Sequence, residues 1–132
     1  MKTTAWQALL GALLCGVAQS AAPHGCDPVD KYLIGHYHGA CDESTELPKG
    51  KGEAKGADTY VGDFNEGKPD GHGVYTWENG ARLDGAFREG KAHGRGVFVA
   101  VSGKRYEGDF VRGRNASLPK AECPITPGPI DC

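Results

Sequence analysis

Residues 60–80 read YVGDFNEGKPDGHGVYTWENG, and residues 83–103 repeat that pattern as LDGAFREGKAHGRGVFVAVSG. The second stretch begins 23 positions after the first (83 minus 60), and no gap interrupts the match. A third copy begins at Tyr106 and stops at Arg114. Glycine-rich disorder does not keep aromatic residues in fixed register, so the period indicates an ordered array. The recurring columns are Tyr60/Leu83/Tyr106, Gly62/Gly85/Gly108, Phe64/Phe87/Phe110, Gly67/Gly90/Gly113, Gly71/Gly94, Gly73/Gly96, Tyr75/Phe98 and Gly80/Gly103.

Each copy reads as a β-hairpin. Large apolar residues stand two apart on either side of a glycine, and alternation of two is a strand signal. We predict a strand over residues 58–65, a turn-rich stretch over 66–72 and a second strand over 73–78. The dipeptides Asn79-Gly80 and Ser102-Gly103 predict two-residue turns with a positive φ at both positions. The expected fold is all-β: a single-layer antiparallel β-meander of tandem 23-residue hairpins, with five strands between Asp58 and Val111.

The two faces of this sheet differ in composition. One carries the aromatic and glycine columns, and the other carries charged residues and valines. Glycine normally weakens a strand by up to about 1 kcal/mol, so its recurrence in one column indicates a steric use. An aromatic ring of the next strand can lie over the bare backbone, and Gly85→Val is therefore expected to unfold the array.

These residues resemble the MORN repeat family, whose pattern is roughly Y-x-G-x-(F/W)-x-x-G-K-x-x-G-x-G-x-(Y/F)-x-x-x-x-G. Residues 60–80 fit it throughout, and the next copy departs only in having Leu83 in the tyrosine column. The resemblance covers about 55 residues. It implies protein–protein contacts, apposition to membranes and, as proposed for the family, binding to phosphoinositides.

The N-terminus has the layout of a secretory signal. Lys2 is followed by an apolar run over residues 8–17 and by the small-x-small site Ala18-Gln19-Ser20. The run is too short to span a bilayer. The alternative is a buried apolar helix. We predict a signal peptide over 1–20, an N-terminal cap over 21–57, the repeats over 58–114 and a proline-rich tail over 115–132.

The cap contains traces of another repeat. Tyr37 and Gly39 lie 23 positions before Tyr60 and Gly62 (60 minus 37), and Cys41 falls in the phenylalanine column. The segment Gly50-Lys-Gly52 resembles the Gly-x-Gly of the later copies, shifted by two. The alternative is a plain polar linker.

Four cysteines remain after the signal, and an even count in a short exported chain indicates two disulfides with three pairings. Six strand steps separate the Cys41 strand from the Tyr106 strand, or roughly 29 Å, whereas a disulfide allows about 7 Å between Cα atoms. Unless the tail folds back along the sheet, this favours Cys26–Cys41 and Cys123–Cys132. A metal site is the weaker alternative, because no C-x-x-C pair exists.

No catalytic set is evident, and we expect neither enzymatic activity nor a cofactor nor a metal. His36 and His38 point to one face of a strand but lack a further ligand at a matching offset. His72 and His93 fall in the predicted turn regions, 21 apart, and are interpreted as solvated (93 minus 72). The triplet Asn115-Ala-Ser117 fits an N-glycosylation acceptor in a eukaryotic host.

The formal charge of −2 argues against a protein that binds mainly nucleic acid. Residues 58–87 carry six acidic and two basic residues (net −4), and residues 88–114 carry seven basic and three acidic (net +4). An uncovered aromatic face would be a partner surface. We therefore expect a periplasmic or extracellular module that binds a protein or an envelope component, with anionic lipid only weakly supported. A self-assembling envelope protein is the alternative, and an accessory enzyme is a distant third. The candidate binding residues are Tyr75, Trp77, Phe87, Phe98, Arg95, Arg105 and Arg112.

Overall fold

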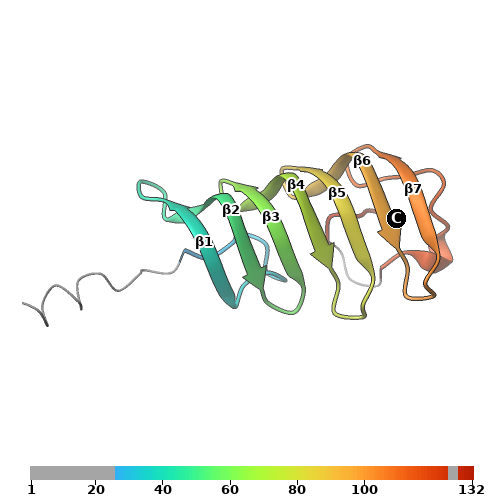
Figure 1. Cartoon of the computed structure of the whole chain (residues 1–132), viewed down its shortest axis with the longest axis horizontal. Helices are drawn as coiled ribbons and strands as arrows, with labels where there is room; N and C mark the ends of the chain where they lie inside the picture. Colours follow the sequence, from blue (N-terminus) through green and yellow to red (C-terminus); the bar gives the residue numbers. More distant parts are fainter. Residues whose placement is uncertain (1–25, 125–127) are drawn as a thin grey trace, which may run out of the picture.

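A computed structural model describes residues 26–124 and 128–132, so the predicted signal over 1–20 lies outside the described residues. Seven strands form one antiparallel sheet in the order of the sequence, as the labels in Figure 1 show. Within the described part of the chain, the only helical element is the 3-10 turn η1 (Lys120–Glu122). The strands are β1 (His36–Asp42), β2 (Leu47–Lys55), β3 (Thr59–Asn65), β4 (Lys68–Thr76), β5 (Arg82–Arg88), β6 (Lys91–Val99) and β7 (Arg105–Phe110).

The predicted meander is confirmed, and β3 to β7 are the five strands expected between Asp58 and Val111. One boundary was wrong, because β4 begins at Lys68 and not at Gly73. The connection before it has only two residues, Glu66 and Gly67, with φ angles of 52° and 79°. Glycine supplies the second left-handed position at little cost, so the strand resumes at once.

The other kind of turn was also assigned wrongly. At Asn79-Gly80 only the glycine has a positive φ, of 95°. The Trp77 amide donates to the Ala81 carbonyl at 2.9 Å, which closes a three-residue loop over 78–80. The turns with two successive positive φ angles are instead Glu66-Gly67, Glu89-Gly90 and Arg112-Gly113.

The glycine columns face one another across each hairpin. Gly62 is paired with Gly73, and Gly85 with Gly96. A Cβ placed on Gly85 would lie 2.6 Å from the Arg95 carbonyl oxygen and 2.6 Å from the Gly96 Cα. At Gly73 it would strike the ring of Tyr60. The columns therefore allow backbone and ring to approach closely, as the sequence pattern indicated.

The hairpin of β1 and β2 has the geometry of the later repeats. Gly39 is paired with Gly52, and Gly50 with Phe64, as Gly71 is with Phe87. Its connecting turn spans residues 43–46 rather than two residues, which accounts for the two-position shift of Gly-x-Gly in the sequence.

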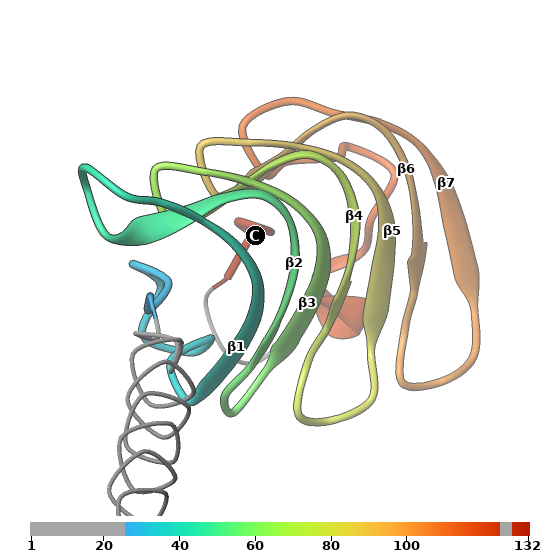
Figure 2. The same cartoon turned by 60° about the vertical axis from the view of Figure 1, so that its left-hand side comes forward.

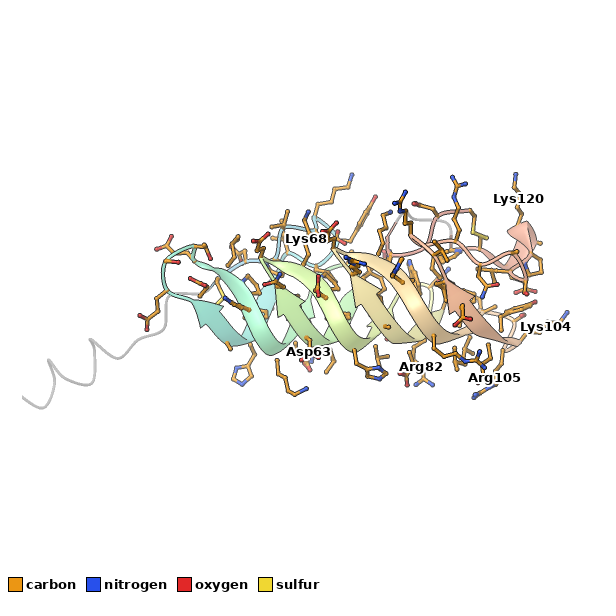
Figure 3. All side chains as sticks on the ribbon, turned by 90° about the horizontal axis from the view of Figure 1, so that it is seen from above. Asp63, Lys68, Arg82, Lys104, Arg105 and Lys120 are labelled. Carbon is orange, nitrogen blue, oxygen red and sulfur yellow. A yellow bond between two sulfur atoms is a disulfide. The ribbon has the colours of Figure 1, made fainter. Side chains whose placement is uncertain are left out.

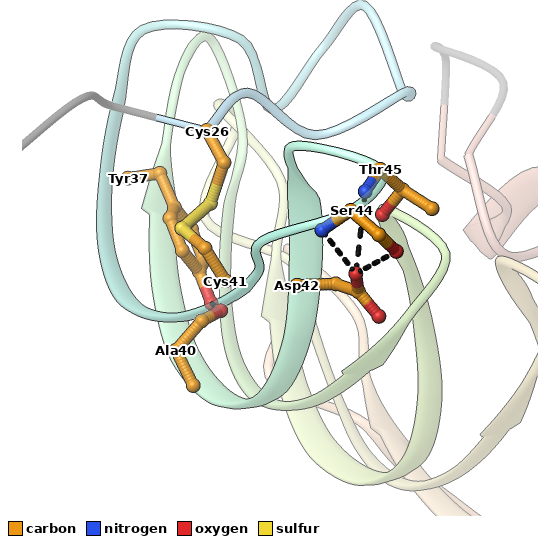
Figure 4. Close-up of a disulfide and its surroundings, with 7 residues drawn as sticks. All are labelled: Cys26, Tyr37, Ala40, Cys41, Asp42, Ser44 and Thr45. Carbon is orange, nitrogen blue, oxygen red and sulfur yellow. Dashed lines mark hydrogen bonds between the residues drawn. A yellow bond between two sulfur atoms is a disulfide. The ribbon is translucent and has the colours of Figure 1, made fainter.

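Two disulfides stabilise the ends, and they are the pairs that the strand spacing favours. Cys26 is bonded to Cys41, with Cα atoms 6.2 Å apart, and Cys123 to Cys132, with Cα atoms 6.4 Å apart. Figure 4 shows the first pair beside the turn after β1. There the Ser44 hydroxyl and the Ser44 and Thr45 amides donate to Asp42 and lower the pKa of its carboxyl to about 2.

The sheet is curved, and the described segment before β1 and the C-terminal tail lie on its hollow side (Figure 2). We call this the concave face, and the opposite one the convex face. The core occupies the concave face. Within the described residues, no helix has the length and apolar character needed to cross a membrane. The largest buried side chains include Tyr60, Tyr75, Phe98, Phe110, Leu33 and Leu83.

Candidate functional site

The four aromatic residues expected to offer a partner surface are core residues. Tyr75 and Phe98 have 0% exposure, Trp77 2% and Phe87 3%. Trp77 packs edge to face on Phe98, with ring centroids 5.7 Å apart. The expectation that these four side chains are accessible to a partner is therefore wrong. The alternating pattern correctly gave the face on which they lie, but not what covers it.

The C-terminal tail supplies part of that cover. Pro129 and Ile130 are buried, and a Cβ on Gly128 would lie 3.2 Å from Trp77 Nε1. The Ala92 amide donates to the Pro129 carbonyl at 2.9 Å, and the Asp131 amide to the Gly113 carbonyl at 2.9 Å. The tail thus folds back onto the sheet, which the sequence argument had left open as an exception.

The segment before β1 covers the other end of the concave face. Leu33 is fully buried in the aromatic core. The Val29 amide donates to the Gly67 carbonyl at 2.9 Å, and the Asp58 amide donates to the Tyr32 carbonyl at 2.9 Å. The segment over residues 26–35 and the C-terminal tail therefore both pack on the concave face and belong to the core.

A buried carboxylate joins the hairpins from within. Asp58 is 1% exposed, and it accepts the Tyr75 hydroxyl at 2.7 Å and the Glu78 amide at 2.9 Å. Burial, followed by this hydrogen bond, raises the pKa of Tyr75 far above its ordinary value. Because all these groups have partners and solvent cannot reach them, we assign Asp58 and Tyr75 a structural role.

The convex face carries exposed pairs of opposite charge across neighbouring strands. Lys51 lies 3.3 Å from Asp63, and Arg95 lies 3.4 Å from Glu107. Such exposed pairs contribute about 0–1 kcal/mol each. Figure 3 shows Arg82 and Arg105 projecting on this side of the sheet, and Lys104 and Lys120 at the C-terminal end.

The three candidate arginines do not form one cluster. Arg95 lies opposite Asp109, near one end of the β6–β7 pair, whereas Arg105 lies opposite Val99 at the other end. Arg112 lies in the turn after β7, with a φ of 51°. All three are exposed. Their charge indicated that these side chains are accessible, but the repeat pattern did not indicate that they are spread around the C-terminal end.

Arg112 contributes to a pocket of about 470 Å³ near that end. Lys91 in its wall is held by Asp131 at 3.0 Å and by the Gly128 carbonyl at 3.0 Å. The pocket joins the tail to two successive turns. Its lining residues are Arg88, Glu89, Lys91, His93, Arg112 and Asp131.

One of the two histidines, His93, lines this pocket and has a structural role there. His72 and His93 lie in β4 and β6, so their assignment to turns was wrong. The Nδ1 of His93 accepts the Arg112 amide at 3.2 Å, just as the carboxylate of Asp70 accepts the Glu89 amide at 3.1 Å. Asp70 and His93 stand 23 apart (93 minus 70), and alignment of the copies could have revealed this shared role.

The pocket mixes both charges, since Glu89 and Asp131 lie beside its basic groups. Within residues 26–124 and 128–132, no three His, Cys, Asp or Glu side chains come together as a ligand set for a metal ion. What the C-terminal end offers is a rigid, exposed and mainly basic surface that is suited to recognition. We call the exposed surface that carries Arg95, Arg105 and Arg112 the C-terminal surface.

Comparison with known families agrees with the repeat geometry. The MORN repeat model matches residues 60–82 and 84–105. The first match covers β4 and all of β3 except Thr59, and the second covers β6 and β5 from Asp84 onward. A search of curated proteins found no match. MORN repeats are generally non-enzymatic and are associated with interaction modules.

Proposed function

We propose that this chain, which belongs to the MORN repeat family, is an exported, non-enzymatic module. In this proposal it binds a partner protein through its C-terminal surface. The observation that carries this proposal is the self-covered concave face. Because the segment before β1 and the C-terminal tail cover that face, a partner meets the convex face and the exposed ends of the array.

Export is supported by the covalent structure of the chain. Disulfides form and persist in oxidising compartments, and small exported domains use them to supplement a limited core. The two bonds stand at either end of a single-layer sheet. Together with the signal-like sequence over 1–20, they favour a periplasmic or extracellular location.

Binding through the C-terminal surface is supported by rigidity and charge. Residues 88–114 carry a net charge of +4, from seven basic and three acidic residues, and the three candidate arginines project from a hydrogen-bonded framework. Arginine is enriched at protein interfaces, where its planar fork recognises carboxylates. The proposed partner is accordingly a protein with an acidic surface.

The test is quantitative capture of the partner from the native envelope or secretome. A triple variant, Arg95→Ala with Arg105→Ala and Arg112→Ala, is compared with wild type and with the matched triple Arg→Lys variant. We expect the alanine variant to lose most of the captured partner at an unchanged melting temperature, and the lysine variant to retain part of it. Equal capture by wild type and the alanine variant contradicts the proposal.

A further inference from the structure

Strand β7 ends the sheet in the middle of a repeat. In the complete repeats, β3 and β5 occupy the same position in the hairpin, and each has a neighbour on both sides. In the described part of the chain, β7 pairs only with β6. It forms the right-hand edge of the sheet in Figure 1.

The chain begins the missing strand and then leaves it. Val111 and Arg114 form an antiparallel bridge around Arg112-Gly113, as Arg88 and Lys91 do around the preceding turn. The second copy has Gly94-x-Gly96, and the equivalent positions of the third copy are Ser117-Leu-Pro119. Proline cannot donate to a ladder, and a side chain does not fit where glycine opposes glycine. Leu118 packs against the core instead.

This departure leaves one edge of β7 without backbone partners. Val111 and Arg114 exchange amide–carbonyl hydrogen bonds in both directions, at 2.9 and 3.0 Å. Because the bonding direction alternates along an antiparallel strand, the outward groups before Val111 belong to Arg105, Glu107 and Asp109. Among the described residues, no segment outside the sheet bonds to the backbone of these three.

Charged side chains often protect a sheet edge, but here they do not block it. The side chains of Arg105 and Glu107 lie on the convex face, as Arg82 and Asp84 do on β5. Strand β5 carries those charges and is nevertheless paired on both sides. The pairing of β7 with β6 has no bulge, and β7 has no proline, so these two further protective devices are absent from this strand.

We propose that the outer edge of β7 binds an extended segment of a partner protein as an added, antiparallel eighth strand. This rests on the proposed function, because Arg105 belongs to the same C-terminal surface. The register of β5 with β6 defines the ligand. Gly85 faces Gly96 and Leu83 faces Phe98, so the added strand places glycine opposite Gly108 and an aromatic residue opposite Tyr106.

The occupant is another protein rather than a second copy. The Gly-x-Gly strands of this chain are β2, β4 and β6, and each already has two neighbours. The strands of a second copy that have a free edge in the described residues are β1 and β7. With Gly39 opposite Gly108, β1 places Cys41 and not an aromatic residue opposite Tyr106. With Gly108 opposite Gly108, two β7 strands place Glu107 opposite Asp109, and like charges directly opposite each other destabilise a sheet. The exposure of Tyr106 also agrees with an added strand. Tyr106 is only partly buried, whereas Tyr60 and Leu83, at the same position of the earlier repeats, are buried.

The probe is a synthetic peptide with the sequence of residues 94–99, GRGVFV, added to the disulfide-bonded, isotopically labelled full chain. It leaves out residues 91–93, because Arg114 already occupies the position opposite Val111. We expect NMR shifts concentrated at the Arg105, Glu107 and Asp109 amides. The control peptide replaces the glycine at position 96 with valine and is expected to bind at least tenfold more weakly. Shifts centred elsewhere, or equal affinity of the two peptides, overturn the proposal.

A second comparison uses the edge itself. Glu107→Pro removes one outward amide, which an edge strand tolerates, while Glu107→Ala keeps it. We expect the proline variant to lose at least tenfold in peptide affinity and the alanine variant to stay within twofold. Equal affinities contradict strand addition. If the proline variant does not fold, two peptides replace it, each N-methylated at a different set of alternate amides. We expect only one of the two sets to abolish binding, because only alternate amides of an added strand face β7. Binding of both methylated peptides would overturn the proposal.

The outcomes also separate this inference from the proposed function. If partner capture requires the three arginines but is unchanged in Glu107→Pro, the function stands and strand addition is wrong. If sedimentation shows a dimer of the chain that Glu107→Pro abolishes, the edge serves a second copy, and the stated occupant is wrong.

Discussion

At the scale of single residues, the glycines of the paired columns decide whether the array can form. Gly85 has an extended backbone that any residue can adopt, so the requirement is space and not conformation. By contrast, Gly80 has a φ of 95° and open space around its Cβ position. The two positions therefore need glycine for different reasons.

Gly85→Val is expected to destabilise the fold by about 3 kcal/mol or more, or to prevent folding, because the added atoms meet backbone that cannot move aside. The matched control is Gly80→Asn, which adopts the left-handed region at a cost of about 1 kcal/mol or less. Denaturant unfolding of the two variants measures the difference. Equal stabilities would show that the glycine columns are not needed for close packing.

The buried tyrosines predict alkaline instability. Burial, followed by nearby carboxylates, raises the pKa of Tyr60, and burial with the Asp58 hydrogen bond raises that of Tyr75. An unfolded tyrosine ionises near pH 10, so the stabilisation is fully present below that pH and is lost as the pH rises above it. Each residue contributes a slope of up to about 1.4 kcal/mol per pH unit.

Unfolding free energies between about pH 9 and 12 test this. Tyr75→Phe removes one of the two ionisations and is expected to reduce the slope by roughly half, besides costing about 1–3 kcal/mol from the unsatisfied Asp58. An unchanged slope in this variant, or tyrosinate absorbance from both residues in folded protein near pH 10, contradicts the account.

At the scale of elements, the strands were largely predictable and the turns were not. Alternation around Gly62 and Gly85 placed five strands and both faces, because packing on a pleated sheet has a period of two. The turn after β3 was predicted over residues 66–72 but comprises only Glu66 and Gly67. Its length was wrong because glutamate rarely adopts a left-handed φ, and the 52° of Glu66 is imposed by the hairpin. Asn79-Gly80 suited a two-residue turn locally, but the Trp77–Ala81 pairing selects a three-residue loop.

The two disulfides are expected to stabilise their ends differently. By loop closure alone, each is worth about 3 kcal/mol, which corresponds to a fall of roughly 10 °C or more in Tm when it is removed. The sequence separations are 15 and 9 residues. The Cys123–Cys132 bond also holds the tail over Trp77, so its loss should expose the indole.

Thermal unfolding and Trp77 fluorescence of two variants measure this difference. Cys123→Ser with Cys132→Ser is expected to lower Tm and to shift the emission to longer wavelength. Cys26→Ser with Cys41→Ser should lower Tm but leave the emission in place. If both pairs give the same emission as wild type, the tail is not held by its disulfide.

At the scale of the whole molecule, the folding back of the tail was the feature that the sequence did not determine. Gly128, Pro129 and Ile130 carry no periodic signal, and their contacts with Tyr75 and Lys91 join residues far apart in the chain. Which of the candidate binding residues are accessible depends on this folding back of the tail. With the tail in place, the aromatic candidates become core and only the arginines remain accessible.

Ile130 tests how firmly the tail is attached. It is 4% exposed within the aromatic core, so Ile130→Ala is expected to cost about 2–4 kcal/mol. The matched control is Val101→Ala, since Val101 is 65% exposed and should change stability by less than about 0.5 kcal/mol. Similar losses in the two variants would contradict a packed tail.

The central claim is that the chain covers its own aromatic face, and the accessibility of Trp77 tests it most directly. In a chain that begins at Ala21, Trp77 is the only tryptophan. Collisional quenching of its fluorescence by acrylamide and iodide is measured in the native protein and in denaturant. The structure, with Trp77 2% exposed, predicts a short-wavelength emission and weak quenching that rises sharply on unfolding. Native quenching close to that of the unfolded chain would show that the face is open and would contradict the account.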